Sequence, residues 1–126
     1  MKTKFLMISS SIFLGILGIT LSFIPDEIIS GLSEVPNPIS ILLLQLLGAI
    51  YLGFAMLNWM AKGTLIGGVY NKPIAIGNFM HFTIGGLALI KIITKIDTHL
   101  EIIIFLTVFY VIFALLFAYV FKTNPT

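Results

Sequence analysis

The sequence predicts an all-α fold, a four-helix antiparallel bundle that spans a membrane. Of its 126 residues, 59% are hydrophobic and only 10% are charged, and the mean hydropathy is +1.13. So few charged side chains do not cover a soluble globule of this size. Four apolar runs approach the length of about 20 helical residues that a hydrocarbon core requires, namely residues 5–24, 39–61, 73–91 and 100–121. We therefore expect a single domain over residues 1–126 with lipid as its solvent.

The first span follows a basic lead and carries no charge over residues 5–24. A secretory signal has a shorter apolar core and a small-residue cleavage site, which the stretch LSFIPDE lacks, so we expect a retained membrane helix. Small residues recur along it at intervals of four, three and four, at Ser11, Gly15, Gly18 and Ser22. This spacing places them on one stripe of a helix, where another backbone can approach closely.

Proline residues mark the limits of the loop that follows. Pro25 ends the first span, and the acidic stretch after it contains Asp26, Glu27 and Glu34 and no lysine. We expect a short interfacial turn in this stretch. Asn37 is then a candidate N-cap and Pro38 a candidate first helical residue of the second span, because proline fits the first turn of a helix.

The second span has a broad small and polar face. At 100° per residue, seven side chains fall within an arc of roughly 140°: Gln45, Gly48, Tyr51, Leu52, Ala55, Asn58 and Trp59. We expect this arc to face the bundle interior, with Leu43, Ile50 and Leu57 facing lipid.

The third and fourth spans complete the bundle. Pro73 opens the third after the turn 63–72, and four of its residues lie within about 80° of one another: Asn78, His81, Gly85 and Ala88. Thr98 and Glu101 match a capping box for the fourth span. Its phenylalanines repeat every four residues, a ridge typical of packing or lipid contact.

The distribution of lysine predicts the orientation. Five lysines fall on one predicted side and two on the other, together with all five acidic residues. Since positive charge is enriched in cytoplasmic loops, we expect a multi-pass protein of the cell membrane with both termini in the cytoplasm.

Helical rise then predicts a polar cluster within the bundle. At about 1.5 Å per residue, Asn58 and Asn78 lie at a similar height, and His81 lies nearly one turn deeper. We expect a cavity in the inner-leaflet half, lined by five candidate ligand-binding residues: Tyr51, Asn58, Trp59, Asn78 and His81. Ser10 of the first span is at a comparable height.

Two interpretations of this cluster compete. In the first, the Asn and His side chains have a structural role alone and join helices through hydrogen bonds, each of which typically stabilises the protein by about 0.6 kcal/mol. Alternatively, an ionisable residue within a membrane span indicates a functional site, because charge there is costly and histidine titrates near neutral pH.

Several function classes are disfavoured by composition. Cysteine is absent, which removes disulfides and thiolate metal sites, and all seven basic residues are lysines, which removes the bidentate guanidinium fork. We therefore expect no nucleic-acid partner. Apart from Glu101 at the start of the fourth span, no acidic residue lies within a span, so no Ser-His-Asp triad can be assembled. We predict a non-enzymatic protein with no catalytic residue, no metal site and no cofactor.

The layout resembles the small four-helix bacterial membrane proteins of DoxX-like type. The features that carry the resemblance are the break at Pro25 and Asp26 after the first span and the run Leu47-Gly48-Ala49-Ile50-Tyr51-Leu52-Gly53. The resemblance covers the chain in outline and transfers no functional residue.

The sequence thus predicts an integral membrane protein that binds a small apolar or amphipathic ligand, or a partner helix, through the inner-leaflet cavity. The alternative is a small oligomeric transporter or channel in which His81 titrates. The lipid bilayer is the expected environment in both cases, and a homo-oligomer is compatible with each.

The topology is directly testable. Single cysteines introduced beside Lys62 and beside Glu34 should react with a membrane-impermeant thiol reagent from opposite sides of the membrane. Labelling of both positions from the same side would overturn the predicted orientation. The native chain contains no cysteine, so the unmodified protein is the background control.

Overall fold

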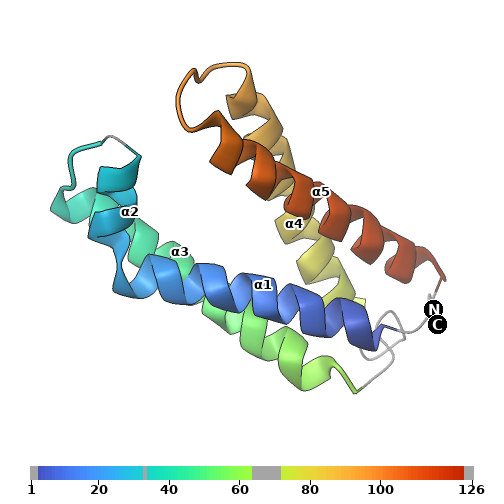
Figure 1. Cartoon of the computed structure of the whole chain (residues 1–126). Coiled ribbons are helices and arrows are strands. Elements are labelled where there is room, and N and C mark those ends of the chain that lie inside the picture. Colours follow the sequence, from blue (N-terminus) through green and yellow to red (C-terminus); the bar gives the residue numbers. More distant parts are fainter. Residues whose placement is uncertain (1–2, 33, 64–71, 124–126) are drawn as a thin grey trace. The chain divides into compact units, whose positions relative to one another are not determined.

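The computed structural model describes residues 3–32, 34–63 and 72–123. These residues form five helices (Figure 1), which are α1 (Lys4–Phe23), α2 (Pro25–Gly31), α3 (Pro38–Ala61), α4 (Lys72–Ile93) and α5 (Leu100–Thr123). All except α2 are long and apolar enough to cross a membrane. The predicted all-α fold with four membrane-length helices is confirmed.

Contacts divide the chain into two compact units. One comprises residues 7–62 and the other residues 1–6 with residues 63–126. We call them the α1–α3 unit and the α4–α5 unit and describe each by itself. The turn expected at residues 63–72 lies almost entirely in residues 64–71, outside the described residues. The expectation of one domain over residues 1–126 stays a prediction.

The start of α3 is confirmed in detail. Asn37 is the N-cap, and its side-chain oxygen accepts hydrogen bonds from the backbone N–H groups of Ile39 and Ser40, both at 3.0 Å. Ser40 Oγ in turn accepts from the backbone N–H of Asn37 at 3.2 Å, which completes a capping box. Pro38 occupies the first helical turn. This arrangement satisfies backbone donors that lipid could not.

The stretch after Pro25 and the capping of α5 differ from expectation, whereas α5 starts at the predicted residue. The stretch after Pro25 forms the short helix α2 rather than a turn, with Asp26 and Glu27 in its first turn, where acidic side chains favour a helix. Helix α5 begins at Leu100, and His99 before it has a positive φ of 58°. The N-cap position therefore falls on His99, one residue after the Thr98 that the expected capping box requires.

In the α1–α3 unit, two antiparallel helices pack through small residues. A Cβ atom added at Gly48 would lie 2.9 Å from the carbonyl oxygen of Gly18 and 2.5 Å from Ser22 Oγ. A Cβ added at Gly18 would lie 2.9 Å from the backbone nitrogen of Leu52. The small-residue stripe predicted on α1 is thus the surface that α3 contacts. Such close approach is how membrane helices gain dispersion energy where no hydrophobic effect is available.

In the α4–α5 unit, the helices pack through aromatic side chains. Phe82 of α4 is fully buried, and its ring lies 5.0 Å from that of Phe113 and 5.2 Å from that of Tyr110, measured between centroids. Phe117 stacks on the same ring at 5.9 Å. The phenylalanine ridge of α5 is therefore divided, because Phe113 and Phe117 are core residues whereas Phe105 is 60% exposed.

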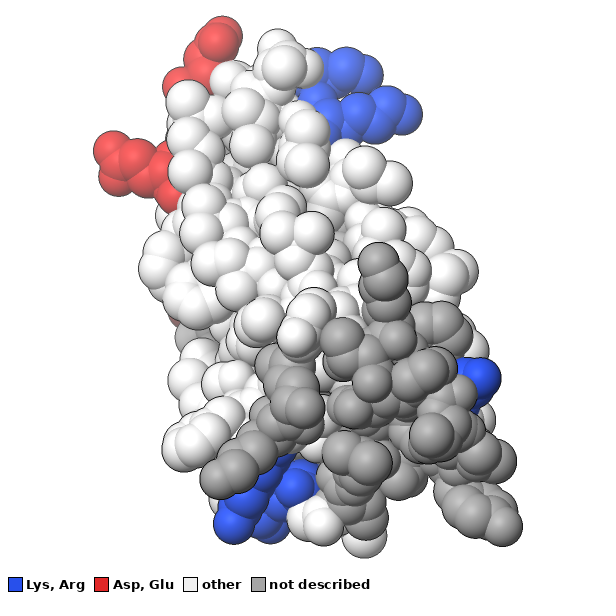
Figure 2. All heavy atoms as spheres, turned by 90° about the vertical axis from the view of Figure 1, so that its right-hand side faces the viewer, with Lys and Arg blue, Asp and Glu red and all other residues white. Residues whose placement is uncertain are grey.

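Charged side chains lie near the helix ends. On the face that Figure 2 shows, red and blue atoms lie in the upper and lower parts of the view, and the white surface between them carries no charged side chain. Large apolar side chains are exposed along all four long helices, among them Ile16, Ile50, Ile84 and Leu115. Exposed apolar surface between charged ends is what a bilayer requires.

We expect Gly48→Ala to destabilise the protein. Its methyl group would meet backbone atoms of α1, and overpacking of this kind costs about 1–3 kcal/mol. Thermal unfolding in detergent measures the effect. Gly53→Ala is the matched control on α3, because nothing lies within 4 Å of its Cβ position, and alanine there should raise the midpoint by favouring the helix. Equal midpoints for Gly48→Ala and wild type would contradict the close contact.

Candidate functional site

Asn58 of α3 is paired with α1. Its side chain is fully buried, and Nδ2 donates a hydrogen bond of 3.0 Å to Oγ of Ser10, which is also fully buried. The Ser10 hydroxyl donates in turn to the carbonyl oxygen of Met7 at 3.1 Å. A chain of bonds therefore runs from the amide to the α1 backbone. The helical rise had predicted only that Ser10 lies at a comparable height in the membrane. The structure shows that the Ser10 and Asn58 side chains are in contact.

His81 of α4 is paired with Tyr110 of α5. Its Nε2 atom lies 3.2 Å from the Tyr110 hydroxyl, within hydrogen-bond distance. Tyr110 is buried, whereas His81 is partly exposed. The imidazole also meets the Phe82 ring edge to face, with centroids 4.8 Å apart. The histidine is thus a polar group held in an aromatic environment.

Tyr110 was missed by the sequence analysis. The pairing could have been predicted from the number of residues that separate each side chain from the loop between α4 and α5. His81 lies 12 residues before Ile93, and Tyr110 lies 10 residues after Leu100. Equal depth on adjacent antiparallel helices permits contact. Gly85 makes room for the phenol, since a Cβ there would lie 2.5 Å from the Tyr110 ring.

The other candidate residues lie in different settings. Asn78 is fully buried, and its Nδ2 donates to the carbonyl oxygen of Ile74 one turn earlier, at 2.9 Å. Tyr51 is partly buried on α3. Trp59 is 46% exposed, and Lys62 Nζ lies 3.9 Å from its ring centroid in a cation–π contact. Aromatic and lysine side chains together are typical of the membrane–water interface.

The expected inward arc of α3 is narrower than predicted. Gly48, Ala55 and Asn58 are buried, as expected. Gln45 and Trp59, which lie toward one side of the arc, are exposed. A helical wheel gives only an angle, whereas burial also depends on the position along the helix and on the length of the side chain.

The five candidate residues therefore belong to two separate units. Tyr51, Asn58 and Trp59 lie in the α1–α3 unit, and Asn78 and His81 lie in the α4–α5 unit. Each polar group for which a bond is given above has a partner within its own unit. The expected grouping of all five around one inner-leaflet cavity stays a prediction.

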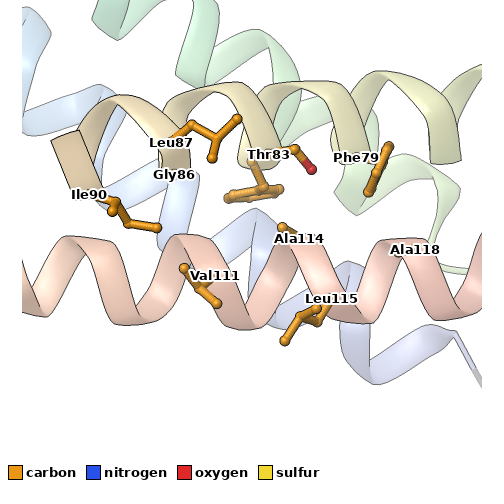
Figure 3. Close-up of a pocket in the computed structure, with 10 residues that line it drawn as sticks. Phe79, Thr83, Gly86, Leu87, Ile90, Val111, Ala114, Leu115 and Ala118 are labelled. Carbon is orange, nitrogen blue, oxygen red and sulfur yellow. The ribbon is translucent and has the colours of Figure 1, made fainter.

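An apolar groove in the α4–α5 unit was not predicted. It has a volume of about 220 Å³ and runs between the two helices (Figure 3), with Thr83 and Gly86 on one side and Ala114 and Ala118 on the other. Its lining combines small residues with larger ones, among them Phe82, Leu87 and Leu115. Ala114 and Ala118, two small residues four positions apart on α5, are the feature of the sequence that could have indicated this groove.

Thr83 is distinctive within this groove. Its Oγ1 atom is buried and has no hydrogen-bond partner, the one such side-chain atom among the described residues. Elsewhere in the spans, hydroxyl groups bond to the preceding turn, as Thr107 does to Ile103 and Thr20 to Ile16, both at 2.7 Å. Figure 3 shows the Thr83 hydroxyl directed from α4 toward α5.

The chemistry available is hydrogen bonding in an apolar setting. Within residues 3–32, 34–63 and 72–123, no three His, Cys, Asp or Glu side chains are placed to hold a metal ion. Neutral imidazole offers one donor and one acceptor, and a phenol offers both. The His81–Tyr110 pair can thus bind a ligand that carries a hydroxyl or carbonyl group.

Comparison of the chain with models of protein families, with characterised proteins and with solved structures finds no match in any of the three. The resemblance to DoxX-like proteins accordingly stays a sequence-based prediction, and the function must be inferred from the residues themselves.

Ser10→Ala should destabilise the α1–α3 unit. The substitution leaves the buried Asn58 amide without its serine acceptor, which costs between about 0.6 and about 2 kcal/mol. Thermal unfolding in detergent measures the loss. Ser9→Ala is the control, because Ser9 is the exposed neighbour on the same helix. If both variants unfold at the same temperature, the hydrogen bond to Ser10 does not stabilise the protein.

Proposed function

We propose that this chain is a non-enzymatic, multi-pass protein of the cell membrane, with cytoplasmic termini, that binds a small apolar or amphipathic ligand. The α4–α5 unit is the binding element, and His81 with Tyr110 forms its polar contact. The single observation that carries the proposal is the 3.2 Å pairing of a partly exposed imidazole with a buried phenol inside a membrane-length helix.

The surroundings of the pair support a binding role. Ligand sites are mostly apolar with a few polar groups that fix orientation. Phe82 and Tyr110 supply apolar walls beside His81, at centroid distances of 4.8 and 5.3 Å.

The geometry also limits the class of ligand. A single polar pair among aromatic rings favours a molecule with a long apolar body and one hydroxyl or carbonyl group. A multiply charged ligand has no counterpart here, because the described part of α4 carries its lysines only at Lys72 and Lys91, close to its two ends.

Photolabelling tests the proposal. A long-chain primary alcohol with a diazirine in its tail is incubated with the protein in liposomes, and the labelled residues are identified by mass spectrometry. We expect saturable labelling of α4 or α5 near His81, competed by the unlabelled alcohol. His81→Phe and Tyr110→Phe should each weaken binding about three- to tenfold, the effect of one hydrogen bond.

Tyr119→Phe is the matched control, because it removes a phenol hydroxyl from α5 at a half-exposed position nine residues beyond Tyr110. Labelling that is unsaturable, or unchanged in both His81→Phe and Tyr110→Phe, would contradict the binding site. Proton flux into liposomes that depends on His81, without saturable labelling, would instead favour the transporter.

A further inference from the structure

The groove between α4 and α5 lies on a different side of α4 from His81. Two residues separate His81 from Thr83, so their side chains diverge by about 160° around the helix. The groove and the proposed ligand contact share Phe82, which lines the groove and contacts His81, but they lie on different sides of α4. We propose that it is a homodimer interface, in which a second copy of this chain packs its own α4–α5 surface against the same surface.

The shape of the surface supports a second copy. Ala114 and Ala118 line the groove on α5, and Leu87 and Leu115, which also line it, have exposed fractions of 61% and 66%. One surface thus offers both a groove and the large side chains that can fill one. Self-complementarity of this kind is what a twofold interface needs, because each copy presents the same residues to the other.

The depth of Thr83 argues against a phospholipid as the occupant. Thr83 lies 11 residues from Lys72 and 10 from Ile93, which places it about 15 Å from either end of α4. This is the middle of a hydrocarbon core about 30 Å thick. A phospholipid presents only methylene groups at this depth and cannot satisfy a hydroxyl group.

A second Thr83 can satisfy the first. A hydroxyl group both donates and accepts, so two copies of Thr83 near a twofold axis can bond to each other. The change required is a rotation about the Cα–Cβ bond to another staggered rotamer, which turns the buried oxygen toward the groove opening. The unpartnered hydroxyl is thereby explained together with the groove.

The volume points the same way. Sites for small molecules usually enclose about 300–1,000 Å³, and this groove holds about 220 Å³. That space suits interdigitating leucine side chains better than a bulky ligand. Small residues that admit a neighbouring helix are the usual means of association in membranes, and the α1–α3 unit uses the same means at Gly18 and Gly48.

Energy transfer between donor- and acceptor-labelled full-length chains in liposomes tests the proposal. Wild type should show transfer that falls on dilution with lipid. Ala114→Leu and Ala118→Leu add large side chains to the lining of the groove and should weaken dimerisation at least tenfold, while helix content by circular dichroism stays unchanged. Ala88→Leu is the control, because it adds the same side chain at an exposed position elsewhere on α4.

Thr83→Val should weaken the dimer about threefold, the effect of one interhelical hydrogen bond, and Thr83→Ser should not.

Cysteine cross-linking provides a second measurement, since the native chain has no cysteine. Thr83→Cys should form a disulfide-linked dimer on mild oxidation. Ile84→Cys lies at the same depth but faces another direction, and its side chain is 58% exposed in the native chain, so random collision would favour it. A monomer at every dilution, or a dimer that Ala114→Leu leaves intact, would overturn the proposal. Stronger cross-linking of Ile84→Cys than of Thr83→Cys would also overturn it. The contact between copies would then lie on another surface, and the groove would be occupied by lipid or by a different helix.

Discussion

Hydrocarbon offers no hydrogen-bond partner, and this constraint determines how the buried polar side chains of the spans are placed. Asn58 bonds to Ser10, Ser10 to the backbone of its own helix, and Asn78 to the backbone of the preceding turn. His81 meets Tyr110. Because every such bond must be made within protein, each one also fixes a contact between helices or stiffens a single helix. Thr83 departs from this rule, and an exception in lipid calls for an explanation.

The same constraint explains why the elements were predictable. Membrane helices must be long and apolar, so the ends of the apolar runs mark the ends of α1, α3, α4 and α5 to within two residues. The N-cap Asn37 and the first-turn residue Pro38 of α3 were predicted because helix capping depends only on residues that are adjacent in the sequence. The helix α2 was not, because a seven-residue segment of mixed character suits a turn equally well. The start of α5 at Leu100 was predicted, but the positive φ of His99 before it was not, because no pattern of side chains indicates it.

The candidate site was predictable only in part. The small-residue stripe on α1 and the height of Ser10 follow from helical periodicity, which is why the contacts of Gly18 and Asn58 agree with expectation. Partners across a hairpin depend in addition on the loop length and on the direction in which a ring points. The pairing of His81 with Tyr110, rather than with an asparagine, has this origin. Trp59 shows the limit of angular reasoning, since Lys62 covers its ring at the end of α3.

The phenol of Tyr110 has a mechanical consequence for its hairpin. Its ring occupies the space above Gly85 and contacts Phe82 and His81 on α4. A shift of α5 along its axis by even one residue would drive this ring into the neighbouring side chains of α4. The ring therefore holds the two helices in register and opposes sliding of one past the other.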